Sequence, residues 1–144
     1  MYGTYLHIYR LSKDYLTVEE HVNTLFPDEY REAPAIIKKD GIYLLITSGC
    51  TGWLPNQGGY SVSDSIEGAW SKVYPLGDET TYKSQSAFLY FNQDKEIVFF
   101  GDRWGGNDFT RKEDFCYEKS GYVGYRVVLH GYKAQLLYSE EVFI

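Results

Sequence analysis

The sequence predicts an all-β fold built from repeated antiparallel units, and two observations support this prediction. The segment 32–49 aligns without a gap on the segment 85–102, so that an apolar strand, a short polar turn and a second apolar strand recur at an offset of 53 residues. Aromatic residues make up 18% of the 144 residues, and such side chains favour the pleated surface of strands. A repeat of about 50 residues that consists of β-hairpins is typical of the blades of a β-propeller.

The N-terminal segment predicts a hairpin. Residues 5–11 are rich in β-branched and aromatic side chains, residues 12–14 supply a polar turn, and residues 16–25 form the next strand. A helix over 18–26 is an alternative, because two glutamates there favour helix formation, but the surrounding strands argue against it. We expect residues 1–26 to be the outer half of a blade whose inner half is absent.

A complete four-stranded blade is expected over residues 31–76. Its first turn is Lys39-Asp40-Gly41, where glycine readily adopts positive φ. A loop rich in glycine follows the second strand at 49–59. The expected strands are 33–38, 42–48, 60–63 and 70–74.

A second complete blade is expected over residues 84–144, with a long polar loop at 104–121. Its expected strands are 86–91, 96–102, 122–130 and 132–143. The chain is therefore expected to be one domain, residues 1–144, with about two and a half four-stranded antiparallel blades. Because this number cannot close a ring, we expect a homo-oligomer that forms through the exposed blade edges.

Composition argues against several classes of partner. The net charge is −6, and no run of Lys or Arg exceeds two residues, so nucleic acid and membrane surfaces are not expected partners. The three histidines are dispersed and no CxxC pair occurs, which predicts no metal site. Glycine-rich nucleotide loops are absent, so no cofactor is expected. Cys50 and Cys116 are equally compatible with one disulfide bridge or two free thiols. Residues 1–5 do not resemble a signal peptide, and the sequence does not indicate a cellular compartment.

Five short motifs carry a resemblance to a known family. They are 31–36 (REAPAI), 47–53 (TSGCTGW), 60–65 (YSVSDS), 84–86 (SQS) and 101–104 (GDRW), in this order. Together they resemble glycoside hydrolase family 43, the five-bladed propeller glycosidases, and are most similar to its exo-β-1,3-galactanase branch. The resemblance implies that only the C-terminal half of the family domain is present. A small β-sandwich binding module is the alternative that composition alone permits.

The resemblance implies an inverting glycosidase that acts on galactan-type or related plant polysaccharide side chains. The alternative is a non-catalytic carbohydrate-binding chain, or an inactive truncated fragment that folds by self-association. Glycoside hydrolysis needs a proton donor at the leaving oxygen, and inversion needs a second group that activates water. Glu32 is the expected general acid, because partial burial at the start of an apolar strand would favour its protonated form. The alternative is a structural pairing with Arg31 or a nearby lysine.

Gln85 stands at the position of Glu32 one repeat later. An amide is a poor base, so its own chemistry suits the orientation of water or a sugar hydroxyl. The resemblance implies instead that Gln85 takes the place of an acidic base, and a hydrogen-bonding role inside the blade is the alternative. The residues expected to contact sugar are Thr51, Gly52, Trp53, Asp102 and Trp104, although Trp53 could equally cover a blade end and Asp102 could pair with Arg103.

Overall fold

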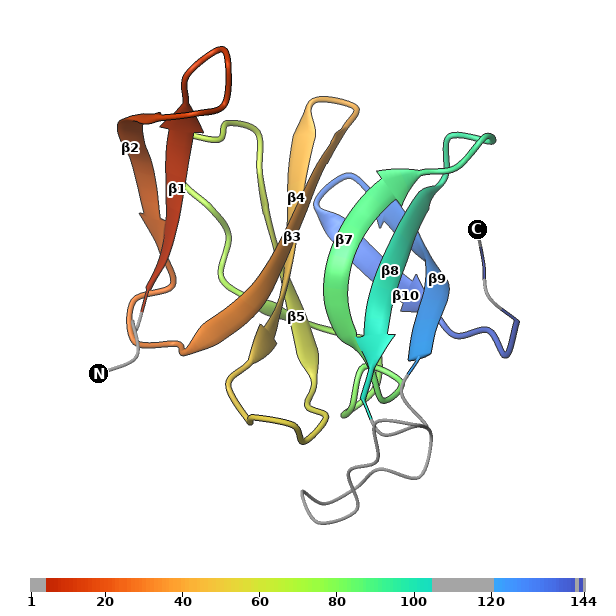
Figure 1. Ribbon diagram of the computed structural model, residues 1–144. Coiled ribbons are helices and arrows are strands. Elements are labelled where there is room, and N and C mark those ends of the chain that lie inside the picture. Colours follow the sequence, from red (N-terminus) through yellow and green to blue (C-terminus); the bar gives the residue numbers. More distant parts are fainter. Residues whose placement is uncertain (1–4, 105–120, 142, 144) are drawn as a thin grey trace.

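Three antiparallel sheets make up the part of the chain that the structure, a computed structural model, describes: residues 5–104, 121–141 and 143 (Figure 1). The first sheet is a hairpin of β1 (Leu6–Leu11) and β2 (Val18–Leu25). The second has the order β3-β4-β5-β6, with β3 (Arg31–Lys39), β4 (Ile42–Gly49), β5 (Gly58–Ser63) and β6 (Tyr74–Leu76). The third has the order β10-β9-β8-β7, with β7 (Gln85–Phe91), β8 (Ile97–Arg103), β9 (Gly121–His130) and β10 (Lys133–Leu137).

This architecture confirms the expected all-β fold, with two four-stranded sheets and one two-stranded sheet. The alternative of a helix over 18–26 is wrong, since residues 18–25 form β2. The described residues contain no helix, and therefore no helix that is long and apolar enough to cross a membrane.

The fourth strand of the second sheet is shorter than the sequence predicts. It was expected over 70–74 but covers only Tyr74–Leu76. Ser71 explains the difference, because its side chain replaces part of the backbone ladder: the Val62 amide donates to Ser71 Oγ at 3.1 Å, and Ser61 Oγ donates to the Ser71 carbonyl at 2.6 Å. The strand expected over 132–143 is likewise limited to Lys133–Leu137.

The two repeated hairpins differ in register by one residue. Ile36 pairs with Leu45, whereas Leu89, at the same place one repeat later, pairs with Phe99. The gap-free alignment equates core residues of β4 and β8, such as Leu44 and Ile97, but it does not carry the strand pairing over, because the turn of the second hairpin is one residue longer. As a result Glu32 pairs with Ser48, while Gln85 pairs with Asp102.

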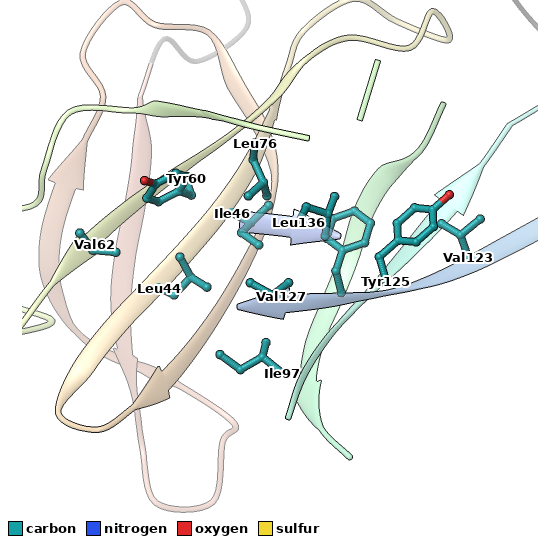
Figure 2. Close-up of a cluster of buried hydrophobic side chains, with 11 residues drawn as sticks. Leu44, Ile46, Tyr60, Val62, Leu76, Ile97, Val123, Tyr125, Val127 and Leu136 are labelled. Carbon is teal, nitrogen blue, oxygen red and sulfur yellow. The ribbon is translucent and has the colours of Figure 1, made fainter. Parts of the chain in front are cut away.

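The main hydrophobic core lies between the second and third sheets (Figure 2). Strand β4 is buried on both faces: Leu44 and Ile46 point into this core, and Leu45 points into a smaller core against the first sheet. Such alternation follows from the two-residue period of a strand. The main core consists of Leu44, Ile46, Tyr60, Val62, Leu76, Ile97, Phe99, Val123, Tyr125, Val127 and Leu136.

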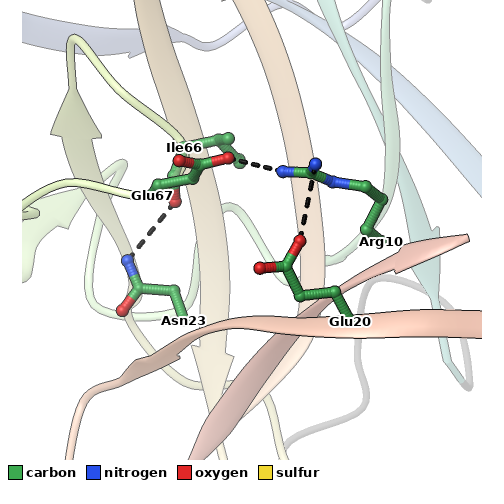
Figure 3. Close-up of polar contacts among 5 residues, drawn as sticks. All are labelled: Arg10, Glu20, Asn23, Ile66 and Glu67. Atoms are coloured by element: carbon green, nitrogen blue, oxygen red, sulfur yellow. Dashed lines mark hydrogen bonds and ion pairs between the residues drawn. The ribbon is translucent and has the colours of Figure 1, made fainter.

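Polar contacts also join the first hairpin to the second sheet (Figure 3). Arg10 on β1 contacts Glu20 on β2 at 3.4 Å and forms an ion pair with Glu67 in the turn after β5. Asn23 Nδ2 donates to the carbonyl of Ile66 in the same turn at 3.3 Å. These contacts join the hairpin to the second sheet beside the smaller apolar core of Leu25, Phe26 and Leu45.

Candidate functional site

A bulge interrupts the start of β3 and of β7 at equivalent places, and it brings the two strands together. The register shifts between Glu32 and Ala35 in β3, and between Ser86 and Phe88 in β7. Ser86 Oγ donates to the Ala33 carbonyl and so connects the two bulges. Bulges bend a strand and redirect its side chains, which here places the beginnings of both strands next to each other.

Glu32 and Gln85 lie side by side at this junction. Gln85 Nε2 donates to Glu32 Oε1 at 3.1 Å and to Ser48 Oγ at 2.8 Å. Both side chains are partly buried, and Ser48 is buried on the neighbouring strand β4. The two groups that the repeat singled out therefore converge on one point. Ser48 was missed, because only the strand pairing reveals that it faces Glu32.

A hollow opens beside this pair, with two tryptophans in its wall. The rings of Trp53 and Trp104 are 5.2 Å apart between centroids and nearly perpendicular, at 73°. Trp53 is 40% exposed, so part of its side chain faces solvent. The lining residues are Ser48, Gly52, Trp53, Leu54, Pro55, Asn56, Lys83, Ser84, Gln85 and Trp104. The sequence predicted four of them and missed the other six, because only the folded chain brings them to this hollow.

The loop that bears Trp53 is held by one amide side chain. Asn56 accepts a hydrogen bond from the Gly49 amide and donates to the Gly49 carbonyl, both at 2.9 Å. It also donates to Thr51 Oγ1 at 2.7 Å, and that hydroxyl donates to the Leu54 carbonyl at 2.6 Å. Thr51 is therefore engaged within the loop and is not among the residues that line the hollow. Gly52 does line it, with φ of 64°, a conformation that favours glycine.

Asp102 lies opposite Gln85 on β8, so the two side chains share one face of the sheet. Partial burial raises the pKa of the Asp102 carboxyl above its ordinary value, because desolvation disfavours the charged form. Asp102 does not line the hollow itself. Its neighbour Arg103 donates to the Tyr82 carbonyl at 2.9 Å and to the Tyr125 hydroxyl at 2.7 Å, which fixes the end of β8.

The turn before Gln85 has a left-handed backbone. Thr81, Tyr82 and Lys83 have φ values of 53°, 53° and 58°. Asp78 braces this turn, since one carboxylate oxygen accepts the Tyr82 amide at 2.7 Å and both the amide and the hydroxyl of Thr80. Although partial burial opposes the effect, these hydrogen bonds hold the pKa of Asp78 below its ordinary value. Lys83 and Ser84, the last residues of the turn, line the hollow.

Cys50 follows β4 and lies close to Glu32. Partial burial and then the nearby Glu32 carboxylate raise the pKa of the Cys50 thiol. Cys50 is a free, exposed thiol, whereas Cys116 and most of the loop expected at 104–121 lie outside the described residues. Within the described part of the chain, no group of three or more His, Cys, Asp or Glu side chains could hold a metal ion.

Comparisons with known proteins find similarity at the level of solved structures. No protein-family model and no curated protein matches the chain. The exo-β-1,3-galactanase of Clostridium thermocellum matches 94% of this chain at 37% identity, with a TM-score of 0.82. A putative exo-β-1,3-galactanase of Bifidobacterium bifidum matches 94% of this chain at 32% identity, with a TM-score of 0.77. The Phanerochaete chrysosporium exo-β-1,3-galactanase, solved with β-1,3-galactotriose, matches 94% of this chain at 26% identity, with a TM-score of 0.80.

The chain spans less than half of each of these relatives. It covers 29% of the Clostridium protein, 46% of the Bifidobacterium protein and 30% of the Phanerochaete protein. Within that part, the likeness extends over nearly the whole chain and includes all three sheets. A β-1,3-galactosidase described as GH43 also matches 97% of this chain at 30% identity, with a TM-score of 0.81, and the chain covers 40% of it. These structures relate the chain to part of the exo-β-1,3-galactanase-like group of glycoside hydrolase family 43.

Proposed function

We propose that this chain contributes the proton-donating part of a glycosidase site that acts on β-1,3-linked galactan. The observation that carries the proposal is the contact between Glu32 and Gln85, at the edge of a hollow walled by Trp53 and Trp104. Tryptophan faces stack on the apolar faces of sugar rings, and a carboxyl group beside such a platform is suited to protonate a leaving oxygen. The solved relative that holds β-1,3-galactotriose supports this class of ligand.

In this proposal Glu32 is the general acid and Gln85 orients the attacking water or a sugar hydroxyl. Inverting glycosidases keep their two catalytic groups about 6.5–9.5 Å apart, which leaves room for a sugar and a water. The atoms of Gln85 and Glu32 are only 3.1 Å apart, so sugar binding has to replace their hydrogen bond before the reaction proceeds. The Ser48 hydroxyl then remains as a partner for the Gln85 amide.

That short contact also favours a second candidate function, carbohydrate binding without turnover. A closed Glu32–Gln85 pair leaves the tryptophan wall available while it blocks the space for an attacking water. The chain also spans less than half of each of these solved relatives. Under this alternative a galacto-oligosaccharide binds beside Trp53 and is not cleaved.

Galactose release from β-1,3-galactan separates these two functions. We expect release by the wild-type chain and a loss of about 10²–10⁴-fold in rate for Glu32→Gln, because the amide cannot donate the proton. Glu19→Gln, on the exposed strand β2, is the matched control and should keep the wild-type rate. Equal rates for Glu32→Gln and wild type would contradict the assignment of the acid. Binding of β-1,3-galactotriose without galactose release would support the second candidate.

A further inference from the structure

The left-handed turn before Gln85 is in contact with the loop that bears Trp53. Three successive residues without glycine are rarely left-handed, because the side chain crowds its own backbone. Such a conformation persists where the surrounding structure enforces it, and it is often found at functional sites. Asp78 braces this turn from one side, and Thr81, which is only 3% exposed, holds it to the preceding loop.

The Thr81 hydroxyl bridges two backbone groups of the preceding loop. It donates to the Asn56 carbonyl at 2.9 Å and accepts a hydrogen bond from the Gly58 amide at 2.5 Å. A Cβ atom at position 58 would come within 2.9 Å of this hydroxyl, so glycine is what permits the approach. On the other side, the Thr81 carbonyl accepts a hydrogen bond from Ser84 Oγ at 2.6 Å, directly before Gln85.

We propose that Thr81 is a positioning residue that sets the two walls of the hollow relative to each other. One wall is the loop with Trp53, which Asn56 organises, and the other is the end of the turn that leads into Gln85. The Thr81 hydroxyl accepts a hydrogen bond from Gly58 at the end of the first wall, and the Thr81 carbonyl accepts one from Ser84 in the second wall. This inference rests on the proposed function, since it assigns Thr81 a role in sugar binding at that site.

Two substitutions separate the hydroxyl from the shape of the side chain. Thr81→Val keeps the shape but leaves the Asn56 carbonyl and the Gly58 amide without their partner, and Thr81→Ser keeps the hydroxyl. We expect Thr81→Val to speed hydrogen exchange of the Gly58 amide about tenfold, and to weaken the binding of β-1,3-galactobiose, followed by tryptophan fluorescence, by a similar factor. Thr81→Ser should restore both values to within about threefold of wild type. If Thr81→Val fails to fold, Thr81→Ala removes the same hydroxyl with less crowding.

The amides of β8 distinguish positioning from general destabilisation. Exchange at Val98, which is fully buried, should not change in Thr81→Val, whereas equal acceleration at Val98 and Gly58 would overturn the proposal. Wild-type exchange at Gly58 in Thr81→Val would overturn it as well. If the wild-type chain binds no galactobiose, the proposed function fails, and the exchange rates still decide whether Thr81 holds the two walls together.

Discussion

At the scale of single residues, Asp102 links the electrostatics of the site to stability. Its pKa is raised by burial, so the folded state disfavours the charged carboxylate. The stability contribution of the neutral acid is therefore fully present below the ordinary value of 3.8, and it is lost as the pH rises through the higher pKa of the folded state. We expect Asp102→Asn to raise the melting temperature at about pH 7 and to have little effect at about pH 3.

Thermal unfolding of wild type and Asp102→Asn across this pH range tests the prediction. Asp64→Asn, an exposed carboxylate in the turn after β5, is the control and should leave the melting temperature unchanged at either pH. A lower melting temperature for Asp102→Asn at neutral pH would mean that the carboxylate makes a stabilising contact that outweighs its desolvation.

The sequence predicted the chemically distinctive residues of the site but not the residues that hold them. Glu32, Gln85 and Trp53 could be predicted because their residue types suit glycosidase chemistry and because the repeat related the first two. Ser48 and Thr81 could not be predicted, because the role of each buried hydroxyl depends on a hydrogen-bond partner that lies far away in the sequence. Hydrogen bonds between distant segments leave no local pattern, so such residues emerge only from the folded chain.

At the scale of elements, the close approach of β7 and β8 depends on Gly101. A Cβ atom at this position would lie 2.5 Å from a ring atom of Phe99 and 2.9 Å from the backbone carbonyl of Gln85. Since that carbonyl moves only with its strand, we expect Gly101→Ala to destabilise the fold by about 1–3 kcal/mol, as overpacked sites generally do. Denaturant unfolding measures this loss.

Gly121→Ala provides the matched control on the neighbouring strand β9. A Cβ atom there meets nothing within 4 Å, so the substitution should be neutral or slightly stabilising. A Gly101→Ala protein as stable as Gly121→Ala would contradict the tight packing of β7 on β8.

Elements were predicted best where alternation of apolar residues was strong. Strands β4 and β8 contribute to a core and followed the pattern, whereas the short β6 did not. The side chain of Ser71 took part in the ladder there, and strand propensity does not capture such a competition between side chain and backbone. The one-residue change in hairpin register was also hidden, because turn length was not visible in an alignment of apolar strands.

At the scale of the whole molecule, the stack of sheets ends on both sides in exposed aromatic rings. Such surfaces on a small protein favour association with another chain. We predict that the protein forms homo-oligomers through these faces and that Phe88→Ser, at a ring that is 48% exposed, shifts it toward the 16.7 kDa monomer. One face carries Tyr5, His7, Tyr9 and His21, and the other carries Phe88, Phe100 and Tyr122.

Light scattering coupled to size-exclusion chromatography, over a range of concentrations, tests this prediction. Tyr15→Ser, at a ring that is 79% exposed in the hairpin turn between β1 and β2, removes a comparable aromatic surface away from the two faces and should not change the mass. A wild-type protein that stays at 16.7 kDa at every concentration would refute self-association.

The number of residues that the turn between β7 and β8 takes up decides which side chain of β8 faces Gln85. A strand that slides by one position presents its opposite set of side chains. If one residue were deleted from 92–96 and the turn kept its present length, β8 would slide by one position, and Arg103 rather than Asp102 would come opposite Gln85. An insertion or deletion at the tip of a hairpin, far from the site, can thus change which side chain lies beside the site, just as a substitution within the site does.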